Sequence, residues 1–342
     1  MIAIGVIYGS RRAPGAAGRS RLVGAWAAIG GAALPAGPVI GGLLVQAAGW
    51  RGVFWLGVPV IALALLPVIR LPRPSARRRP EGSVDRAGAG LLVAALTCGV
   101  TAIIQAPASP PPAGLLAVAA GCALLALLVV ERRVAHPLLA VPRGARLPLG
   151  LACLVAGLMN LYSLGGLFLL TQILQDVHRL DPLSAGLLTL PAMLPLPLLG
   201  APAGRLSTRI GAWRTSALGL TVAAAGLAGV AATVTGPVTG HLALALFLAL
   251  RGTGLGLLTP AIVSAALATT PGSPGLASGA SNTSRQTGGA LGIALFATIA
   301  GRADAPGFLP HAIGLFAGPA TLLALTGLFC LGIARNPRIR LA

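Results

Sequence analysis

Arg251 lies within a long apolar run, "LALRGTGLGLLTP", where it is the only charge that the sequence places deep in such a run. Burying an arginine in hydrocarbon costs about 2.5–3.5 kcal/mol on the scale measured by membrane insertion, so its guanidinium should face a cavity or a partner. That partner could be a substrate or a coupling group. Arg251 could equally be structural, donating to backbone carbonyls near the neighbouring glycines or reaching towards the outer interface. The residues leave these interpretations open.

A second group of polar side chains falls on another apolar run, Leu149–Leu174, and just beyond it. Amide, hydroxyl and phenol groups inside a membrane segment can bond the polar part of a small molecule. Together with Arg251, these side chains could bind such a molecule. They are Asn160, Tyr162, Thr171, Gln172 and Gln175.

The sequence lacks the residue combinations that most enzymes use for catalysis. All 25 basic residues are arginine, so no lysine is present to bind phosphates in a P-loop or to form a Schiff base. The 4 cysteines lack metal-ligand spacing, and no embedded Ser–His pair, Asp pair or nucleotide-binding loop occurs. We therefore expect no enzyme, cofactor, metal or nucleotide. The acidic residues all fall outside the apolar runs, although proton-coupled transport usually uses an embedded carboxylate or histidine.

The composition explains where these side chains must sit. Hydrophobic residues make up 56% of the chain and charged residues 9%, whereas soluble domains carry about 25% charged residues. So few charges cannot cover a water-facing surface, so the lipid bilayer is the expected partner. The net charge of +19 comes from short arginine clusters between apolar runs, which indicate membrane topology rather than nucleic-acid binding.

The sequence predicts an all-α polytopic membrane protein. A spanning helix needs about 20 mostly apolar residues, and the runs are continuously apolar rather than alternating, which favours helices over a β-barrel. The ten predicted helices are Leu22–Ala47, Val53–Ile69, Gly88–Gln105, Ala113–Val130, Leu149–Leu174, Leu183–Ala203, Thr215–Val234, His241–Ala266, Gly279–Ala300 and Ala312–Ile333.

The arginines give these helices an orientation. If the chain before Leu22 is cytoplasmic, the arginine clusters, with Arg285 counted among them, alternate onto the cytoplasmic side. The opposite side keeps only Arg51, Arg179 and Arg302. We therefore expect a multi-pass protein of the cell membrane with a cytoplasmic C-terminus.

Glycine and proline are concentrated in "LPAGPVIGGLL", residues 34–44. Small residues at four-residue spacing let helix backbones approach closely in lipid. They lie at Ala33, Gly37 and Gly41, with Gly42 beside them. Pro38 cannot donate to the carbonyl of Leu34, so a bend is expected there. A second ridge of small residues comprises Ala280, Ser284, Gly288 and Gly292.

The first of these patterns closely resembles the antiporter signature, motif C, of the major facilitator superfamily. The matching residues are Gly24, Ala33, Gly37, Pro38, Gly41 and Gly42, with Ala33 in place of a glycine. "GRLSTRIGAWR" resembles the second copy of the cytoplasmic motif A through Gly204, Arg205, Arg209 and Gly211. Thr208 replaces the acidic residue of that motif, which puts a charge-locked gate there in doubt. "ERRVAHPLL", "LSAGLLTLP" and "SGASNTSRQTGGALG" are similar to segments of the fourteen-helix drug:proton antiporter branch (EmrB/QacA type).

The resemblance implies a division of the chain. Residues 1–21 would be the remnant of an earlier helix and a cytoplasmic loop, and 22–69 the last two helices of an N-terminal bundle. Residues 70–146 would hold arginine-rich loops and two extra central helices, and 147–342 a C-terminal six-helix bundle with a cytoplasmic tail. The helix Leu149–Leu174 would open that bundle and line its central cavity, so its polar side chains and Arg251 would be the candidate substrate-cavity residues. The first four helices of the family would be missing, so the chain looks N-terminally truncated.

The function that the resemblance implies is proton-coupled efflux of drugs or other lipophilic small molecules by alternating access. The proton gradient would be the energy source. The alternative is a membrane protein that does not transport, either a truncated remnant or a half that pairs with or scaffolds another chain. In-frame upstream sequence encoding four more helices would favour transport, and an upstream stop codon would favour the alternative.

Overall fold

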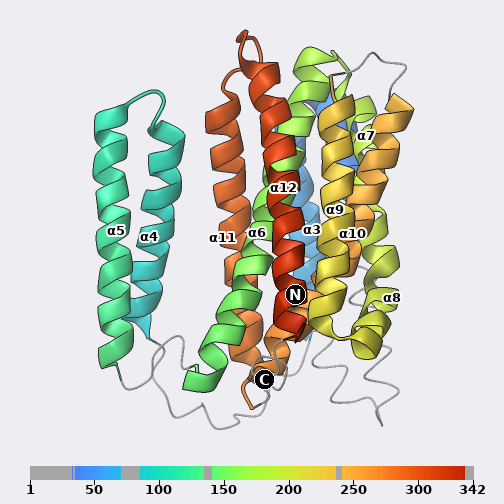
Figure 1. The fold of residues 1–342 in the computed structure, drawn as a ribbon. Helices are drawn as coiled ribbons and strands as arrows, with labels where there is room; N and C mark the ends of the chain where they lie inside the picture. The colour runs from blue at the N-terminus through green and yellow to red at the C-terminus, as the bar shows by residue number, and fades with distance from the viewer. Residues whose placement is uncertain are drawn as a thin grey trace.

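The computed structural model describes residues 33, 35–70, 85–134, 141–235, 241–270 and 272–335. Within these ranges the regular structure is entirely helical (Figure 1). The helices are Pro35–Ala48, α3 (Trp50–Arg70), α4 (Arg86–Gln105), α5 (Pro110–Arg133), α6 (Arg146–Gln172), α7 (Pro182–Met193), α8 (Pro195–Ile210), α9 (Ala212–Thr233), α10 (His241–Ala268), α11 (Pro274–Ala300) and α12 (Phe308–Arg335). A 3-10 turn, Arg143–Ala145, precedes α6, and a π-helical turn, Ile173–Val177, follows it.

The described helices bear out the all-α membrane prediction but not its count of ten spans. Seven segments are long and apolar enough to cross a bilayer. An eighth arises if Pro35–Ala48 and the start of α3, which are bent by 119° at Gly49, form one broken span. Gly49 has φ +70°, a left-handed conformation that suits glycine.

One predicted span, Gly279–Ala300, falls on α11 but does not qualify as a membrane span. The helix is 27 residues long, which is sufficient. Its first half, "PGLASGASNTSRQ", is too rich in hydroxyl, amide and guanidinium groups. Such a half needs protein rather than lipid around it, because polar groups in hydrocarbon require partners.

Another predicted span, Leu183–Ala203, is divided between α7 and α8 at Leu194. Pro195 has no N–H to donate to the carbonyl of Pro191, so the regular hydrogen-bond ladder is interrupted there. The two pieces together, Pro182–Ile210, still form one membrane-span candidate.

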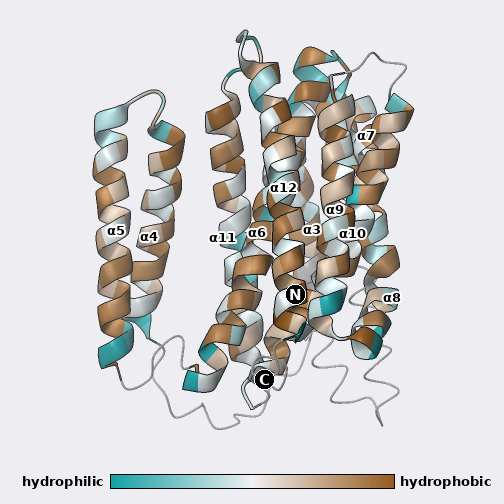
Figure 2. Ribbon diagram, in the orientation of Figure 1, coloured by the Kyte–Doolittle hydropathy of each residue, from teal (hydrophilic) through white to brown (hydrophobic). Residues whose placement is uncertain are grey.

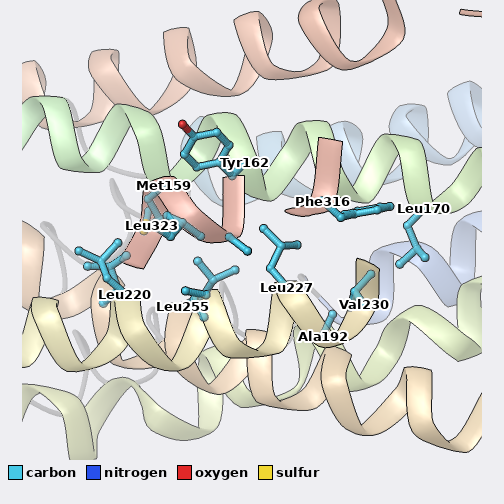
Figure 3. Packing of buried hydrophobic residues seen from close by; sticks show 14 of the residues in the cluster. Met159, Tyr162, Leu170, Ala192, Leu220, Leu227, Val230, Leu255, Phe316 and Leu323 are labelled. Atoms are coloured by element: carbon cyan, nitrogen blue, oxygen red, sulfur yellow. The ribbon is translucent and has the colours of Figure 1, made fainter. Parts of the chain in front are cut away.

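The bundle α6–α12 encloses one hydrophobic core. In it α9 lies between α10 and α12, and α6 packs along α11 (Figure 1). Figure 3 shows the packed side chains, among them Leu220, Leu227, Leu255 and Phe316. The outward faces are also apolar (Figure 2). Outer leucines such as Leu242 are 72% exposed, as expected for side chains that lipid covers.

Helices α4 and α5 form a hairpin beside α11, at the left of Figure 1. The hydroxyl of Thr298 on α11 donates to the carbonyl of Ile103 on α4 at 3.1 Å. This contact lies near the C-terminal ends of both helices. The opposite end of the molecule, at the bottom of Figure 1, is called the arginine-rich end below. Its described arginines are Arg86, Arg132, Arg133, Arg143, Arg146, Arg205, Arg209, Arg214 and Arg335.

Candidate functional site

The glycine–proline stretch meets the C-terminal bundle at a small pocket. The pocket has a volume of about 270 Å³ and lies between the helix Pro35–Ala48, α6 and α7. Pro38, Gly41 and Gly42 line one wall. Thr171 and Gln175, two of the predicted substrate-cavity residues, line another. The fold therefore brings residues more than a hundred positions apart into one site.

Two glycines set the distance across this contact. A Cβ on Gly42 would lie 2.5 Å from the carbonyl oxygen of Pro182 and 2.9 Å from the Cα of Leu183. From the other side, a Cβ on Gly186 would lie 2.5 Å from the carbonyl oxygen of Pro38. Any larger residue would push the two backbones apart, because the opposing atoms are backbone and cannot rotate away.

The remaining small residues of that stretch make no close helix contact, although Gly41 borders the pocket. Ala33 and Gly37 are exposed, and a Cβ on Gly37 or Gly41 would meet no described atom within 4 Å. Gly24 lies outside the described residues.

The start of α7 is held by Asp181, its N-cap. One carboxylate oxygen accepts from the backbone N–H groups of Leu183 and Ser184, each at 3.1 Å. Hydrogen bonds from Ser184 hold the pKa of the Asp181 carboxyl below its ordinary value. This cap satisfies backbone donors of the turn that faces Gly42.

The polar groups around the pocket differ in how they are paired. Thr171 donates to the carbonyl of Leu167 in its own helix at 2.9 Å, and the buried Thr189 donates to Gly186 at 2.7 Å. The side-chain oxygen of Gln172, one residue along α6, is buried and accepts no hydrogen bond within the part of the chain that is described. An unpaired buried acceptor is costly, but Gln172 does not line the pocket itself.

Arg251 is not part of this pocket. It lies on α10, is 4% exposed, and its Nη2 donates to the carbonyls of Ser163 at 2.9 Å and Tyr162 at 3.5 Å. Both acceptors are backbone atoms of α6, and Gly226 on α9 leaves room for the backbone at Arg251. In this geometry Arg251 links α10 to α6, which matches the structural interpretation of its charge.

Asn160 and Tyr162 also lie away from the pocket. The Asn160 side chain donates to the carbonyl of Arg285 on α11 at 2.9 Å. Tyr162 is 9% exposed, and Figure 3 shows its hydroxyl directed away from the aliphatic cluster. The structure thus places Thr171 and Gln175 at the pocket, whereas Gln172 does not line it and Asn160 and Tyr162 lie in the middle of α6.

The assignment of Arg285 to the cytoplasmic loops is wrong. Arg285 lies inside α11, well beyond its first turn, and is half-buried, with an Nε that has no hydrogen-bond partner among the described atoms. The predicted helix Gly279–Ala300 already contains Arg285, so counting Arg285 with the cytoplasmic loops conflicts with that prediction. Arg251 is therefore not the only arginine embedded in the bundle.

The second small-residue ridge packs closely against α6, as predicted. A Cβ on Gly288 would overlap the carbonyl oxygen of Gly157, and one on Gly292 would overlap that of Leu161. The hydroxyl of Ser284 donates to the carbonyl of Cys153 at 2.6 Å. These contacts join α6 and α11 through backbone atoms and one hydroxyl.

The motif A-like loop connects α8 and α9 at the arginine-rich end. Gly211 has φ +94°, which only glycine adopts readily. Arg209 and Gly211 line a cavity of about 410 Å³ with Arg214. Gly204 and Arg205 lie within α8, and the Thr208 hydroxyl donates to the Arg205 carbonyl at 2.7 Å. Thr208 thus pairs within its own helix, where the motif would have a carboxylate.

Comparison with known families gives the chain its class. The model of the Major Facilitator Superfamily matches residues 1–293. The chain belongs to the major facilitator superfamily.

Among individual relatives of this superfamily member, the Tetracenomycin C resistance and export protein of Streptomyces glaucescens is 35% identical over 212 residues, which are 60% of this chain and 39% of that protein. Multidrug resistance protein Stp of Mycobacterium tuberculosis is 32% identical over 206 residues, 58% of this chain and 37% of Stp. The Methylenomycin A resistance protein of Streptomyces coelicolor is 30% identical over 252 residues, 72% of this chain and 52% of that protein. The chain thus spans about 37–52% of the length of these relatives.

Proposed function

We propose that this superfamily member is a secondary transporter of the fourteen-helix drug:proton antiporter branch. It exports lipophilic, drug-like small molecules by proton-coupled antiport and alternating access. The observation that carries the proposal is the pocket where the antiporter-signature residues Pro38, Gly41 and Gly42 meet α6 and α7. The names of the relatives, two of which include resistance to or export of an antibiotic, support the substrate class.

The nature of the contact supports alternating access. Gly42 and Gly186 place the backbone of each helix directly against the backbone of the other. Dispersion contacts of this kind are individually weak and non-directional. Two halves of a transporter that meet on such a surface can separate without breaking a buried ion pair.

The polar groups at the pocket are the proposed substrate contacts. Thr171 and Gln175 line it, and Gln172 brings a buried unpaired acceptor one residue away. A few convergent polar groups in an apolar pocket are typical of sites for small organic molecules. Asn160, Tyr162 and Arg251 hold helices together in our proposal rather than touching substrate.

The proposed orientation places the arginine-rich end in the cytoplasm, together with the C-terminus. The described acidic residues lie at helix ends or in connections, so we assign the proton step to none of them. The division into a remnant, two N-terminal-bundle helices, an extra pair and a six-helix bundle is part of the same proposal. In that division the helix Pro35–Ala48 and α3 belong to the N-terminal bundle.

Efflux measurement tests the proposal. The protein is produced from its own gene in a bacterial host deleted for its main drug pumps, and the loss of fluorescence is followed for a panel of lipophilic dyes. We expect energised cells to export at least one dye, and a protonophore to stop that export. Export that continues without a proton gradient would refute antiport, and no export of any dye or antibiotic would favour the non-transporting alternative.

A pair of matched variants then tests the pocket. Thr171→Val removes a hydroxyl that faces the pocket, while Thr321→Val removes one on the exposed face of α12 that bonds its own helix in the same way, to the carbonyl of Ala317. We expect Thr171→Val to change the concentration dependence of export and Thr321→Val to leave it unchanged. Equal behaviour of the two variants at equal expression would remove the pocket from the substrate path.

A further inference from the structure

A second and larger cavity lies between the α4–α5 hairpin and the bundle. The hairpin contacts the bundle at the hydrogen bond between Thr298 and Ile103, far from the arginine-rich end. Towards the arginine-rich end a cavity of about 810 Å³ opens between α4, α5, α6 and α11. Its lining includes no residue of the helix Pro35–Ala48 or of α7, so it is separate from the proposed substrate pocket.

The walls of this cavity are apolar and its mouth is basic. Leucines from both sides form the walls, which are Leu92, Leu127, Leu128, Leu149 and Leu276. Leu128 is 56% exposed, so the cavity is open sideways where lipid surrounds the protein. Arg132 and Arg146 line the cavity at the end of α5 and the start of α6, which is called its mouth here.

The charge at the mouth favours an anion. Glu131 also lines the cavity, but Arg132 and Arg146 do so too, and Arg133 and Arg143 adjoin them in the chain. The Arg146 Nε donates to the carbonyl of Val141 at 3.2 Å, which fixes its side chain at the cavity wall. Basic pockets between membrane helices are the sites that bind anionic lipid head groups.

The depth of the arginines decides between possible occupants. Arg132 lies in the last turn of α5 and Arg146 in the first turn of α6, so both stand at the level where membrane helices end. A ligand with its charge at that level and its hydrocarbon along the leucines has the geometry of a phospholipid of the adjoining leaflet. A volume of about 810 Å³ lies within the usual range for pockets that enclose one organic ligand, about 300–1,000 Å³.

We propose that this cavity binds one anionic phospholipid. Its phosphate is held by Arg132 and Arg146, and its acyl chains fill the space between the hairpin and the bundle. The lipid completes the packing of the hairpin at the end where helix contacts do not reach. Thr283 and Ser284 of α11 also line the cavity, and the Ser284 hydroxyl already donates to the carbonyl of Cys153 at 2.6 Å, so it needs no partner from the lipid.

The test measures which lipid the purified protein retains. The whole chain is reconstituted into vesicles of equal parts phosphatidylglycerol and phosphatidylcholine, extracted in mild detergent, and analysed by native mass spectrometry. We expect retained phosphatidylglycerol in clear excess over phosphatidylcholine. The combined change Arg132→Gln and Arg146→Gln should weaken retention about thirtyfold, at about 1 kcal/mol for each arginine. The control, Arg205→Gln with Arg335→Gln, removes the same charge from the same end outside the cavity and should leave retention unchanged.

A second variant tests the apolar part without touching charge. A Cβ on Gly279 meets nothing within 4 Å although Gly279 lines the cavity, so Gly279→Leu should fill it and expel the lipid. Gly314→Leu, on the exposed face of α12, makes the same change in equally open space outside the cavity and should have no effect. Thermal unfolding by size-exclusion chromatography verifies that each variant is folded.

Several results would overturn the proposal. They are equal retention of the two lipids, retention unchanged by the arginine pair, and retention unchanged by Gly279→Leu. Displacement of the lipid by an exported compound would also overturn it, because the cavity would then belong to the transport path.

Discussion

Gly42→Ala tests the contact between the antiporter-signature helix and α7. The added Cβ would lie 2.5 Å from the carbonyl oxygen of Pro182. Non-bonded heavy atoms settle at about 3.5–4.0 Å, so the two helices would have to separate by roughly 1 Å. Gly37→Ala, one and a half turns earlier in the same helix, is the matched control, because its Cβ would meet nothing within 4 Å.

The two substitutions share one energetic effect and differ in another. Both replace glycine by alanine inside a helix, which favours the helix by about 1 kcal/mol. Only Gly42→Ala adds an overpacking cost of about 1–3 kcal/mol, because backbone atoms oppose it. The shared effect cancels in the comparison. The closed contact in Gly42→Ala should therefore be about 5–150-fold less populated than in Gly37→Ala.

Thiol labelling measures that population. Thr171→Cys places a thiol at the pocket in a background from which the 4 native cysteines have been removed. If the reagent reacts only when the contact is open, the labelling rate follows the open fraction. We expect faster labelling with Gly42→Ala than with Gly37→Ala, and a matching change in dye export. Equal labelling rates in the two variants would refute the reasoning that this backbone contact closes the pocket.

Three further variants follow from the same structure. Arg251→Met removes hydrogen bonds of the guanidinium that stabilise the fold by about 1.5–3 kcal/mol, and it also removes the cost of burying the charge, about 2.5–3.5 kcal/mol. The free energy of unfolding in denaturing detergent should therefore be unchanged or slightly higher. Loss of export with normal expression would instead assign Arg251 to transport. Gly288→Ala should lower the unfolding free energy by about 1–3 kcal/mol because its Cβ opposes a backbone carbonyl, whereas Gly279→Ala should not, and equal stability of the two would contradict the packing of α6 on α11. Asp181→Ala should lower the melting temperature at neutral pH. The pKa of the Asp181 carboxyl is lower in the folded than in the unfolded protein, so its contribution to stability is present above the ordinary pKa of 3.8 and is lost as the pH falls through the folded pKa. The melting temperatures of wild type and variant should therefore converge at low pH. A difference that persists in acid would show that the carboxylate is not the cause.

Sequence patterns predicted part of what depends on local physics, although Gly37 and Gly41, also at four-residue spacing, make no close contact among the described residues. Scarce charge and long apolar runs indicate membrane helices, because the bilayer requires every backbone group to be paired within its own segment. Small residues at four-residue spacing predicted the tight packing of Gly288 and Gly292. The substitution of Thr208 for an acid is likewise visible without coordinates.

The tertiary structure alone decided which residues meet. Arg251 donates hydrogen bonds to the backbone carbonyls of Tyr162 and Ser163 on α6. Because every residue has a backbone carbonyl, the pattern of side chains in the sequence could not predict these acceptors. The sequence placed Arg285 in a predicted helix, but only the packing of α11 shows that its side chain is half-buried in the bundle. The pocket that joins Gly42 to Thr171 depends on helices far apart in the chain, and its shape follows from their spacing rather than from either sequence alone.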